Sequence, residues 1–335
     1  MVQDVPVKKT ATELTFKERL NLFKDNRFFA ILMPFAILLI VIIIFGPMTN
    51  YKFFSKFVFT GIVNQAMIIA TLAIGVSFIY ATGNLDISVG SVMALAATIG
   101  ALVYNTTGSI LLMITVTILV SVLLMLFNCT MSVVFNIKCI TVAIVVMQIY
   151  GAIESKILGS TELKVPYELC KQLEDGGFRY FAFAAFFILA LVVFHFTKIG
   201  RVIRFIGGNG ECARQTGISN RRYIYITFLM AGLGVGLAAV FTIIRTGSIS
   251  IETGNGMGMD VMLATVLGGM SIFGGAKSNS YSGLTGSLTV SALNKGLLMV
   301  GVSTTILQGI RGVIFLLLVF LTSERQTTLP SREQV

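Results

Sequence analysis

The sequence predicts an all-α, polytopic membrane protein with about ten transmembrane helices, some of them broken, and with both termini in the cytoplasm. The 335 residues are 55% hydrophobic and only 12% charged, whereas about a quarter of the residues of a soluble domain are charged. Apolar runs long enough to cross about 30 Å of hydrocarbon recur along the chain, the first at residues 28–47. These runs are unbroken and show no strand-like alternation, which excludes a membrane β-barrel.

The positive charge is distributed as in a membrane protein. The net charge of +10 could suggest a nucleic-acid partner, but ten spans place 16 Lys and Arg in inside segments and 7 in outside segments. This asymmetry follows the positive-inside rule and puts both termini in the cytoplasm. The basic balance therefore reflects topology, and we expect no nucleic-acid partner. The inside segments are 1–27, 136–138, 198–222, 276–282 and 322–335, and the outside segments are 48–57, 154–179 and 245–258.

The chain divides into three parts. Residues 1–27 form a polar, basic N-terminal segment that we expect to lie on the membrane as an amphipathic helix. The apolar run that follows is of spanning length and is expected to stay as an uncleaved first helix. A single transmembrane domain then covers 28–321, and residues 322–335 form a cytoplasmic tail. The four cysteines form no CxxC pair and suggest no disulfide framework.

The predicted spans follow one another with short connections, apart from a large outer loop at 154–179 and a basic inner loop at 198–222. Pro34 lies within the first span, and the polar pair Asn64–Gln65 lies within the second. Gly232, Gly234 and Gly236 give the seventh span a small-residue surface for close helix packing. The predicted spans are 28–47, 58–80, a third that follows residues 81–91 and ends near 104, 110–135, 139–153, 180–197, 223–244, an eighth that starts near 260, 283–302 and 303–321.

Two stretches combine glycines, an aspartate and a helix start. In the first, residues 83–91, a Gly-Asn pair interrupts the helix before Asp86; the second, at 245–260, leads to Asp260. A charge at membrane depth usually faces a bundle interior or a water-filled path, and paired broken segments mark the pathway of many transporters. Asp86 can equally cap the helix that follows it, and the two interpretations are compatible. The candidate residues of a translocation path are Asn64, Gln65, Asp86, Ser88, Ser91, Asp260 and Asn294.

The loop at 198–222 is the only long polar, basic segment in the middle of the chain. Asn209 is a good N-cap, and Gly217 suits the left-handed position that closes a helix. We therefore expect a short helix from Glu211 to Thr216 between two apolar blocks. Such a capped helix indicates contact with a partner, although a mere connector remains the alternative.

Sequence motifs for catalysis are absent. The run from Gly269 to Ser278 has the wrong spacing for a phosphate-binding loop and follows no strand. No HExxH or GxSxG motif occurs, and the single histidine cannot build a His-rich metal site. We expect no enzymatic activity and no cofactor bound by this chain. If transport needs ATP and Mg²⁺, a partner chain must bind them.

Four stretches, in order, resemble the permease subunits of bacterial ABC importers of the ribose/galactose/xylose branch, which includes autoinducer-2 permeases. They are TGNLDISVGSVMALAA (82–97), IGRVIRFIGGNGECARQTGIS (199–219), ATVLGGMSIFGGAKS (264–278) and LNKGLLMVGVSTTILQGIRGVIFLLLV (293–319). The resemblance runs from about the second span to the C-terminus. The chain departs from the family at Gly256–Asp260, where an acidic or Gln-Leu-Asp run is usual, and at Cys212.

The resemblance implies a multi-pass protein of the bacterial inner membrane. Such a protein would pair with a second copy or a paralogue and would work with a cytoplasmic ATP-binding subunit and an extracytoplasmic sugar-binding protein. The imported solute would be a monosaccharide or a similar small polar molecule. The loop at 207–217 would be the coupling helix that docks on the ATPase. The residues that the resemblance assigns to it are Gly208, Asn209, Glu211, Ala213, Arg214 and Gly217.

Two other classes of function remain open from the sequence. An ion-coupled secondary transporter would use Asp86 and Asp260 as proton or sodium sites, and its uptake would collapse with an ionophore and ignore ATP depletion. A membrane scaffold or receptor subunit would show no transport at all.

Overall fold

The computed structural model describes residues 27–159, 161–271, 273–276 and 278–322. The N-terminal helix expected within 1–27 and the tail expected at 322–335 lie almost wholly outside the described residues. The helices are α2 (Arg27–Met48), η1 (Lys52–Phe54), α3 (Lys56–Ala81), α4 (Val89–Thr107), α5 (Ile110–Val134), α6 (Cys139–Leu158), α7 (Tyr167–Asp175), α8 (Phe178–Leu191), the π-helical turn η2 (Val192–Phe196), α9 (Lys198–Gly208), α10 (Gly210–Gln215), α11 (Asn220–Thr246), α12 (Met257–Leu267), α13 (Ser282–Met299) and α14 (Thr304–Thr322). The only described strands, β1 (Leu163–Lys164) and β2 (Ser248–Ile249), form one short antiparallel pair.

The prediction of a helical, multi-pass protein is confirmed. Six described helices are long and apolar enough to cross a membrane: α3, α4, α5, α6, α8 with its π-helical turn, and α11. Shorter apolar stretches lie in α2, α12 and α14. Most predicted spans fall within a few residues of an observed helix, because continuous apolar runs leave little doubt about where a helix lies.

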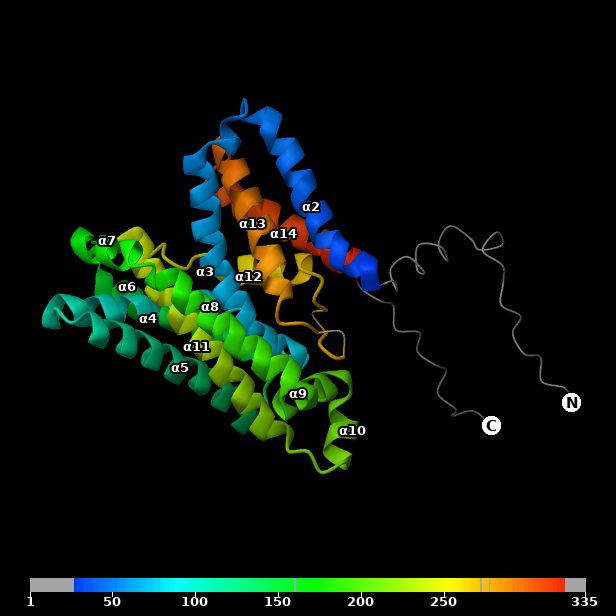
Figure 1. Cartoon of the computed structure of the whole chain (residues 1–335). Helices are drawn as coiled ribbons and strands as arrows, with labels where there is room; N and C mark the ends of the chain where they lie inside the picture. Colours follow the sequence, from blue (N-terminus) through cyan, green and yellow to red (C-terminus); the bar gives the residue numbers. More distant parts are fainter. Residues whose placement is uncertain (1–26, 160, 272, 277, 323–335) are drawn as a thin grey trace, which may run out of the picture.

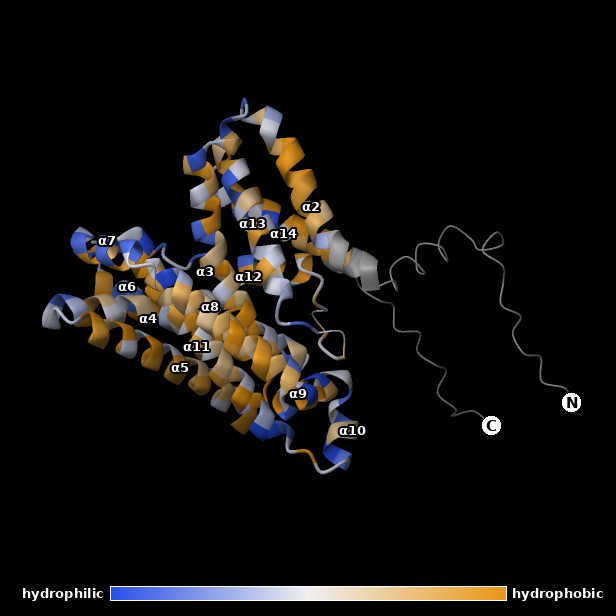
Figure 2. Ribbon diagram, in the orientation of Figure 1, coloured by the Kyte–Doolittle hydropathy of each residue, from blue (hydrophilic) through white to orange (hydrophobic). Residues whose placement is uncertain are grey.

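Helix α3 lies at the centre of the fold and packs against α11 on one side and α13 on the other (Figure 1). Helices α4, α5 and α8 pack against α11, and α6 packs against α4 and α5, whereas α2, α12 and α14 gather around α13. Hydrophilic residues concentrate on α7 and around α10, at opposite ends of the first group (Figure 2). This separation is the pattern expected of a bundle whose two ends reach water on opposite sides of a membrane.

The pattern of burial is that of a membrane protein. Residues 66–81 of α3 are all buried, whereas Leu111, Leu119 and Leu123 of α5 are exposed. Large apolar surface of this kind is unfavourable in water, and lipid can cover it at little cost because acyl chains are as apolar as leucine.

The three glycines of α11 allow close helix contacts, as the sequence predicts. A Cβ atom built on Gly232 or Gly236 would lie 2.8 or 2.7 Å from a backbone atom of α5, and one on Gly234 would lie 2.9 Å from a carbonyl oxygen of α3. Real Cβ atoms do not approach this closely, so only glycine permits this spacing between α11 and its two neighbours.

Four features differ from the expectation or go beyond it. The basic loop contains a second helix, α9, and the outer loop contains α7. The eighth span is represented by α12, which has only 11 residues. The π-helical turn before α9 bends the chain sharply, and a Cβ on Gly200 would lie 1.8 Å from the carbonyl oxygen of Phe194. A hydropathy pattern does not show where a helix bends.

Candidate functional site

Helix α10 is short and closed at both ends, as predicted from Asn209 and Gly217. The Asn209 side chain accepts hydrogen bonds from the backbone N–H groups of Glu211 (3.1 Å) and Cys212 (3.0 Å). Gly217 has a φ of +80°. The N–H of Ile218 donates to the carbonyl of Ala213, and the N–H of Gly217 donates to the carbonyl of Arg214. These two bonds form a Schellman motif, which satisfies carbonyls that a helix end would otherwise leave free.

One face of α10 is charged and exposed, and the other is packed against the protein. Arg214 donates two hydrogen bonds to the Glu211 carboxylate, at 2.6 and 3.2 Å, and both side chains are more than half exposed. This pairing with Arg214 lowers the pKa of the Glu211 carboxyl. Ala213, on the opposite face, is fully buried. An open hollow beside the helix is lined by Arg201, Arg204, Phe205, Gly208, Asn209, Cys212 and Ala276.

The N-cap of α10 gives a direct test of this local structure. Replacing Asn209 by alanine is expected to destabilise α10 by about 1 kcal/mol, because two backbone N–H groups lose their acceptor. The amide protons of Glu211 and Cys212 should then exchange several-fold faster with deuterium. Gln215→Ala changes an exposed residue of the same helix that is not its N-cap and should leave these rates unchanged. Equal rates in the Asn209 variant and the parent protein would contradict the capping role.

The base of this loop packs against the end of α3 through glycines. A Cβ on Gly207 would lie 2.0 Å from the carbonyl oxygen of Ala81 and 2.7 Å from the nitrogen of Gly275. The same carbonyl accepts a hydrogen bond from the N–H of Gly275 at 3.1 Å. A Cβ on Gly274 would lie 2.5 Å from the nitrogen of Gly83. Three segments distant in sequence therefore meet without intervening side chains; we call Ala81–Gly83, Gly207 and Gly274–Gly275 the glycine junction.

Asp86 lies just beyond the glycine junction and is fully buried. Its Oδ1 accepts from the backbone N–H of Ser88 at 2.8 Å and from the Ser88 hydroxyl at 2.6 Å. Asn128 donates to the same hydroxyl at 2.9 Å and accepts from the hydroxyl of Tyr150 at 2.7 Å. The side chain thus holds the turn before α4, in agreement with the capping interpretation, and the network ties α4 to α5 and α6.

Asp260 lies in the first turn of α12 and belongs to a second buried network. Its Oδ1 is 3.1 Å from Nε of Arg311, and its Oδ2 accepts from the amide of Asn294 at 3.2 Å. Arg311 also donates to the amide oxygen of Asn294 at 3.0 Å. The carboxylate is therefore paired with a cation, and the network joins α12, α13 and α14.

The two broken segments predicted from the sequence contact each other. A Cβ on Gly90 would lie 2.5 Å from the carbonyl oxygen of Gly254, and one on Gly258 would lie 2.2 Å from that of Ile87. The starts of α4 and α12 thus lie side by side, each with an aspartate nearby. A carboxylate near a helix N-terminus is favoured by the helix dipole.

Three other candidates, Asn64, Gln65 and Ser91, lie apart from these networks. Asn64 accepts a hydrogen bond from Arg179 at 3.0 Å, and the neighbouring Gln65 accepts one from Arg245. Ser91 is half-buried in the first turn of α4. The seven predicted path residues therefore divide into the Asp86–Ser88 network, the Asp260–Asn294 network, the Asn64–Gln65 pair and Ser91.

Sequence reasoning missed several partners of these residues. Asn128 and Tyr150 lie within predicted apolar spans, where a single polar side chain gives little signal. Arg179 was placed in the outer loop, yet its side chain is almost completely buried. The charge of Arg311 within a predicted span could have indicated a buried partner, since charged residues inside spans are rare and usually paired.

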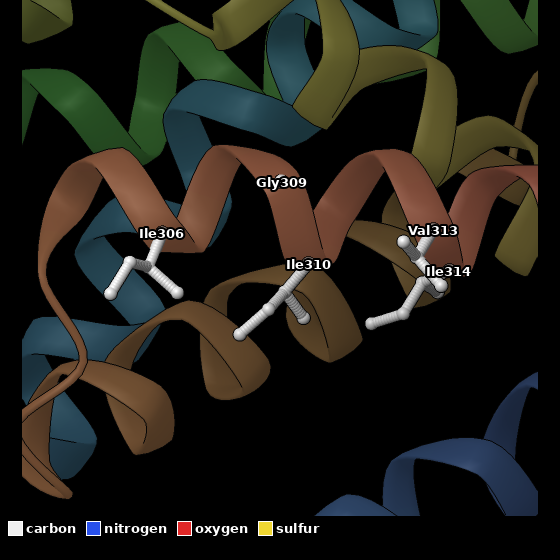
Figure 3. A pocket seen from close by; sticks show the side chains of 5 residues that line it. All are labelled: Ile306, Gly309, Ile310, Val313 and Ile314. Carbon is white, nitrogen blue, oxygen red and sulfur yellow. The ribbon is translucent and has the colours of Figure 1, made fainter.

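A second hollow lies on α14 and is lined by apolar residues (Figure 3). It contains no side chain that hydrogen-bonds a polar solute, so it does not extend the candidate site. Its lining residues are Ile306, Gly309, Ile310, Val313 and Ile314.

Comparison with known proteins gives a consistent result. The family described as "Branched-chain amino acid transport system / permease component" matches residues 58–320. The ribose import permease protein RbsC of Escherichia coli (strain K12) is 24% identical over 87% of this chain and 93% of its own length. The L-arabinose ABC transporter permease protein AraH of Azospirillum brasilense is 27% identical over 79% of this chain and 80% of its own. The autoinducer 2 import system permease protein LsrC of Photorhabdus laumondii is 25% identical over 84% of both chains. No solved structure matches the chain.

Proposed function

The chain belongs to this permease family, and we propose that it is the membrane-spanning subunit of an ATP-driven importer for a monosaccharide or a similar small polar solute. The observation that carries this proposal is the capped helix α10, which exposes a charged face and adjoins α9, whose Gly207 packs directly on the end of the central helix α3. The relatives named above are permeases for ribose, L-arabinose and autoinducer 2, which favours a sugar-like solute over an amino acid.

In this proposal the protein crosses the bacterial inner membrane ten times with both termini in the cytoplasm. The ten crossings are the six longer spans named above together with helix α13 and the shorter apolar helices α2, α12 and α14. The excess of Lys and Arg in the segments assigned to the inside supports this orientation, since such an excess marks cytoplasmic loops. Helices α9 and α10 then face the cytoplasm, and α7 and the β1–β2 pair face the outside.

The proposed partners follow from this topology. A cytoplasmic subunit binds and hydrolyses ATP with Mg²⁺, and it docks on α10. An extracytoplasmic binding protein delivers the solute to the opposite face. A second permease, either a copy of this chain or a paralogue, completes the path. The residues proposed for the ATPase contact are Gly208, Asn209, Glu211, Ala213, Arg214 and Gly217.

The glycine junction connects the docking helix to the membrane. When the ATPase changes shape, α10 moves together with α9, and Gly207 transfers that movement to the carbonyl of Ala81. The segment from Gly83 to Asp86 begins there and leads to the contact between the starts of α4 and α12. A ligand can shift such an equilibrium only by binding the two states differently, so the ATPase must contact α10 differently in its ATP-bound and nucleotide-free forms.

The solute path is proposed to run near the contact between the starts of α4 and α12. Paired discontinuous helices near the middle of the membrane form the binding site in many transporters. The residues proposed to lie near it are Asn64, Gln65, Asp86, Ser88, Ser91, Asp260 and Asn294. The relatives favour ATP-driven transport over ion coupling, and the pairing of Asp260 with Arg311 argues in the same direction.

Arg214 provides a test of the docking role. Arg214→Glu is expected to reduce ATP-driven uptake severely, because it reverses the charge of the exposed face of α10 and places two carboxylates side by side. Membrane insertion and expression should stay unchanged, since the side chain is exposed. Arg222→Glu, which reverses another exposed charge of the same loop, serves as the matched control. Normal uptake by the Arg214 variant would contradict docking through this residue.

The energy source is tested in proteoliposomes that contain the assembled importer. Uptake should require ATP in the ATPase compartment and continue when an ionophore removes the ion gradients. Uptake that ignores ATP and stops with the ionophore would contradict the proposed function.

A further inference from the structure

The outer half of the bundle brings two arginines to one place on α3. Arg179, at the start of α8, donates from Nη2 to the side chain of Asn64 (3.0 Å) and to that of Glu174 (3.0 Å). Arg245, near the end of α11, donates to the side chain of Gln65. Asn64 and Gln65 are consecutive, so both arginines hydrogen-bond to the same turn of α3.

The hydrogen-bonding capacity of Arg179 is only partly used. Its side chain is 2% exposed, yet Nε and Nη1 are buried without a hydrogen-bond partner. A guanidinium has five N–H donors, so three of them are unpaired here. An unsatisfied buried donor is unfavourable, the more so on a charged group.

The charges around Asn64 and Gln65 do not balance. Two arginines face one carboxylate, Glu174, whose side chain is 49% exposed and therefore well solvated. Gln65 is neutral and cannot compensate the charge of Arg245. A second anion would compensate the charge of Arg245 and satisfy the buried N–H donors of Arg179, and guanidinium groups bind carboxylate and phosphate oxygens especially well.

We propose that Arg179 and Arg245, supported by Asn64 and Gln65, form an oxyanion-binding site on the outer side of the protein, for a carboxylate or phosphate group. The oxyanion accepts hydrogen bonds from the unpaired donors of Arg179 and from the exposed guanidinium of Arg245. This site is separate from the docking helix and from the Asp86 and Asp260 networks. Its occupant is either an acidic group of the transported solute or an acidic side chain of the protein that delivers it.

The test uses the purified full-length chain in lipid nanodiscs, with inorganic phosphate and acetate as probes. Each anion is expected to raise the thermal unfolding temperature saturably relative to chloride at the same ionic strength. Arg245→Gln should abolish this shift while keeping the fold, because its side chain is exposed; Arg179→Gln should abolish it as well. Lys171→Gln removes an exposed positive charge from α7 and should keep the full shift. No shift in the parent protein, or an equal shift in the Arg245 and Lys171 variants, would overturn the proposal.

The source of the oxyanion is then distinguished in the assembled importer. Competition by phosphate against binding of the delivery protein identifies a carboxylate of that protein as the occupant. Competition against solute uptake, with binding of the delivery protein unchanged, identifies an acidic solute. Saturable stabilisation of the isolated chain supports the site in both cases, and it does not depend on ATP-driven import.

Discussion

Replacing Gly207 by alanine is expected to reduce ATP-driven uptake by at least about tenfold, because overpacking by one methyl costs about 1–3 kcal/mol. The new Cβ would lie 2.0 Å from the carbonyl oxygen of Ala81, so α9 must move away from α3. That displacement separates the docking helix from the segment that leads to Asp86. Uptake is measured in proteoliposomes at equal protein content.

A glycine outside the junction gives a matched control. Gly151→Ala makes the same chemical change inside helix α6, but no neighbouring atom lies within 4 Å of its Cβ. Alanine is the best helix former, so both substitutions favour the helix in which they lie and differ in the contact with α3. Equal uptake by the two variants would contradict the role of the glycine junction in coupling.

Replacing Asp260 by asparagine is expected to destabilise the protein by about 3–5 kcal/mol, because it leaves the charge of Arg311 buried without a counter-charge. The two side chains are 5% and 11% exposed, so water cannot compensate the loss. The melting temperature of the purified protein should fall by several degrees, and uptake should fall with it.

The double variant Asp260→Asn/Arg311→Gln tests the cause. Removing both charges should restore most of the lost stability, since neutral amides can hydrogen-bond to Asn294 and neither charge is left unpaired. Glu211→Gln breaks the exposed pair on α10 and should change the melting temperature little, because solvent screens that pair. A double variant as unstable as the single one would contradict the ion-pair explanation.

The sequence was most informative where one physical effect dominates. Long apolar runs predicted the helices α3, α5 and α11 to within a few residues, and the capping preferences of Asn209 and Gly217 predicted α10 to within one residue at each end. The small-residue surface of α11 was also predicted. The capping hydrogen bonds of α10 join residues that are close in sequence, and the close packing of α11 requires only that three positions carry no side chain.

The sequence was less informative where distant segments meet. Nothing in a single chain indicates that Gly207 packs on Ala81 or that Gly90 contacts Gly254. Asn128 and Tyr150 lie 42 and 64 residues after Asp86 in the sequence, and Asn294 and Arg311 lie 34 and 51 residues after Asp260. Only tertiary packing brings them into these two networks. Whether the predicted path residues contact solute stays a prediction.

The central claim is that α10 docks on an ATP-binding subunit, and Cys212 allows it to be tested directly. Cys212 is the one exposed cysteine of the four, and it lies on α10. A photoreactive maleimide attached there, in membranes that contain the natural partners, is expected to cross-link to an ATP-binding subunit with a yield that differs between ATP-bound and nucleotide-free states. Absence of any such cross-link, although that subunit is present and uptake is intact, would contradict the account.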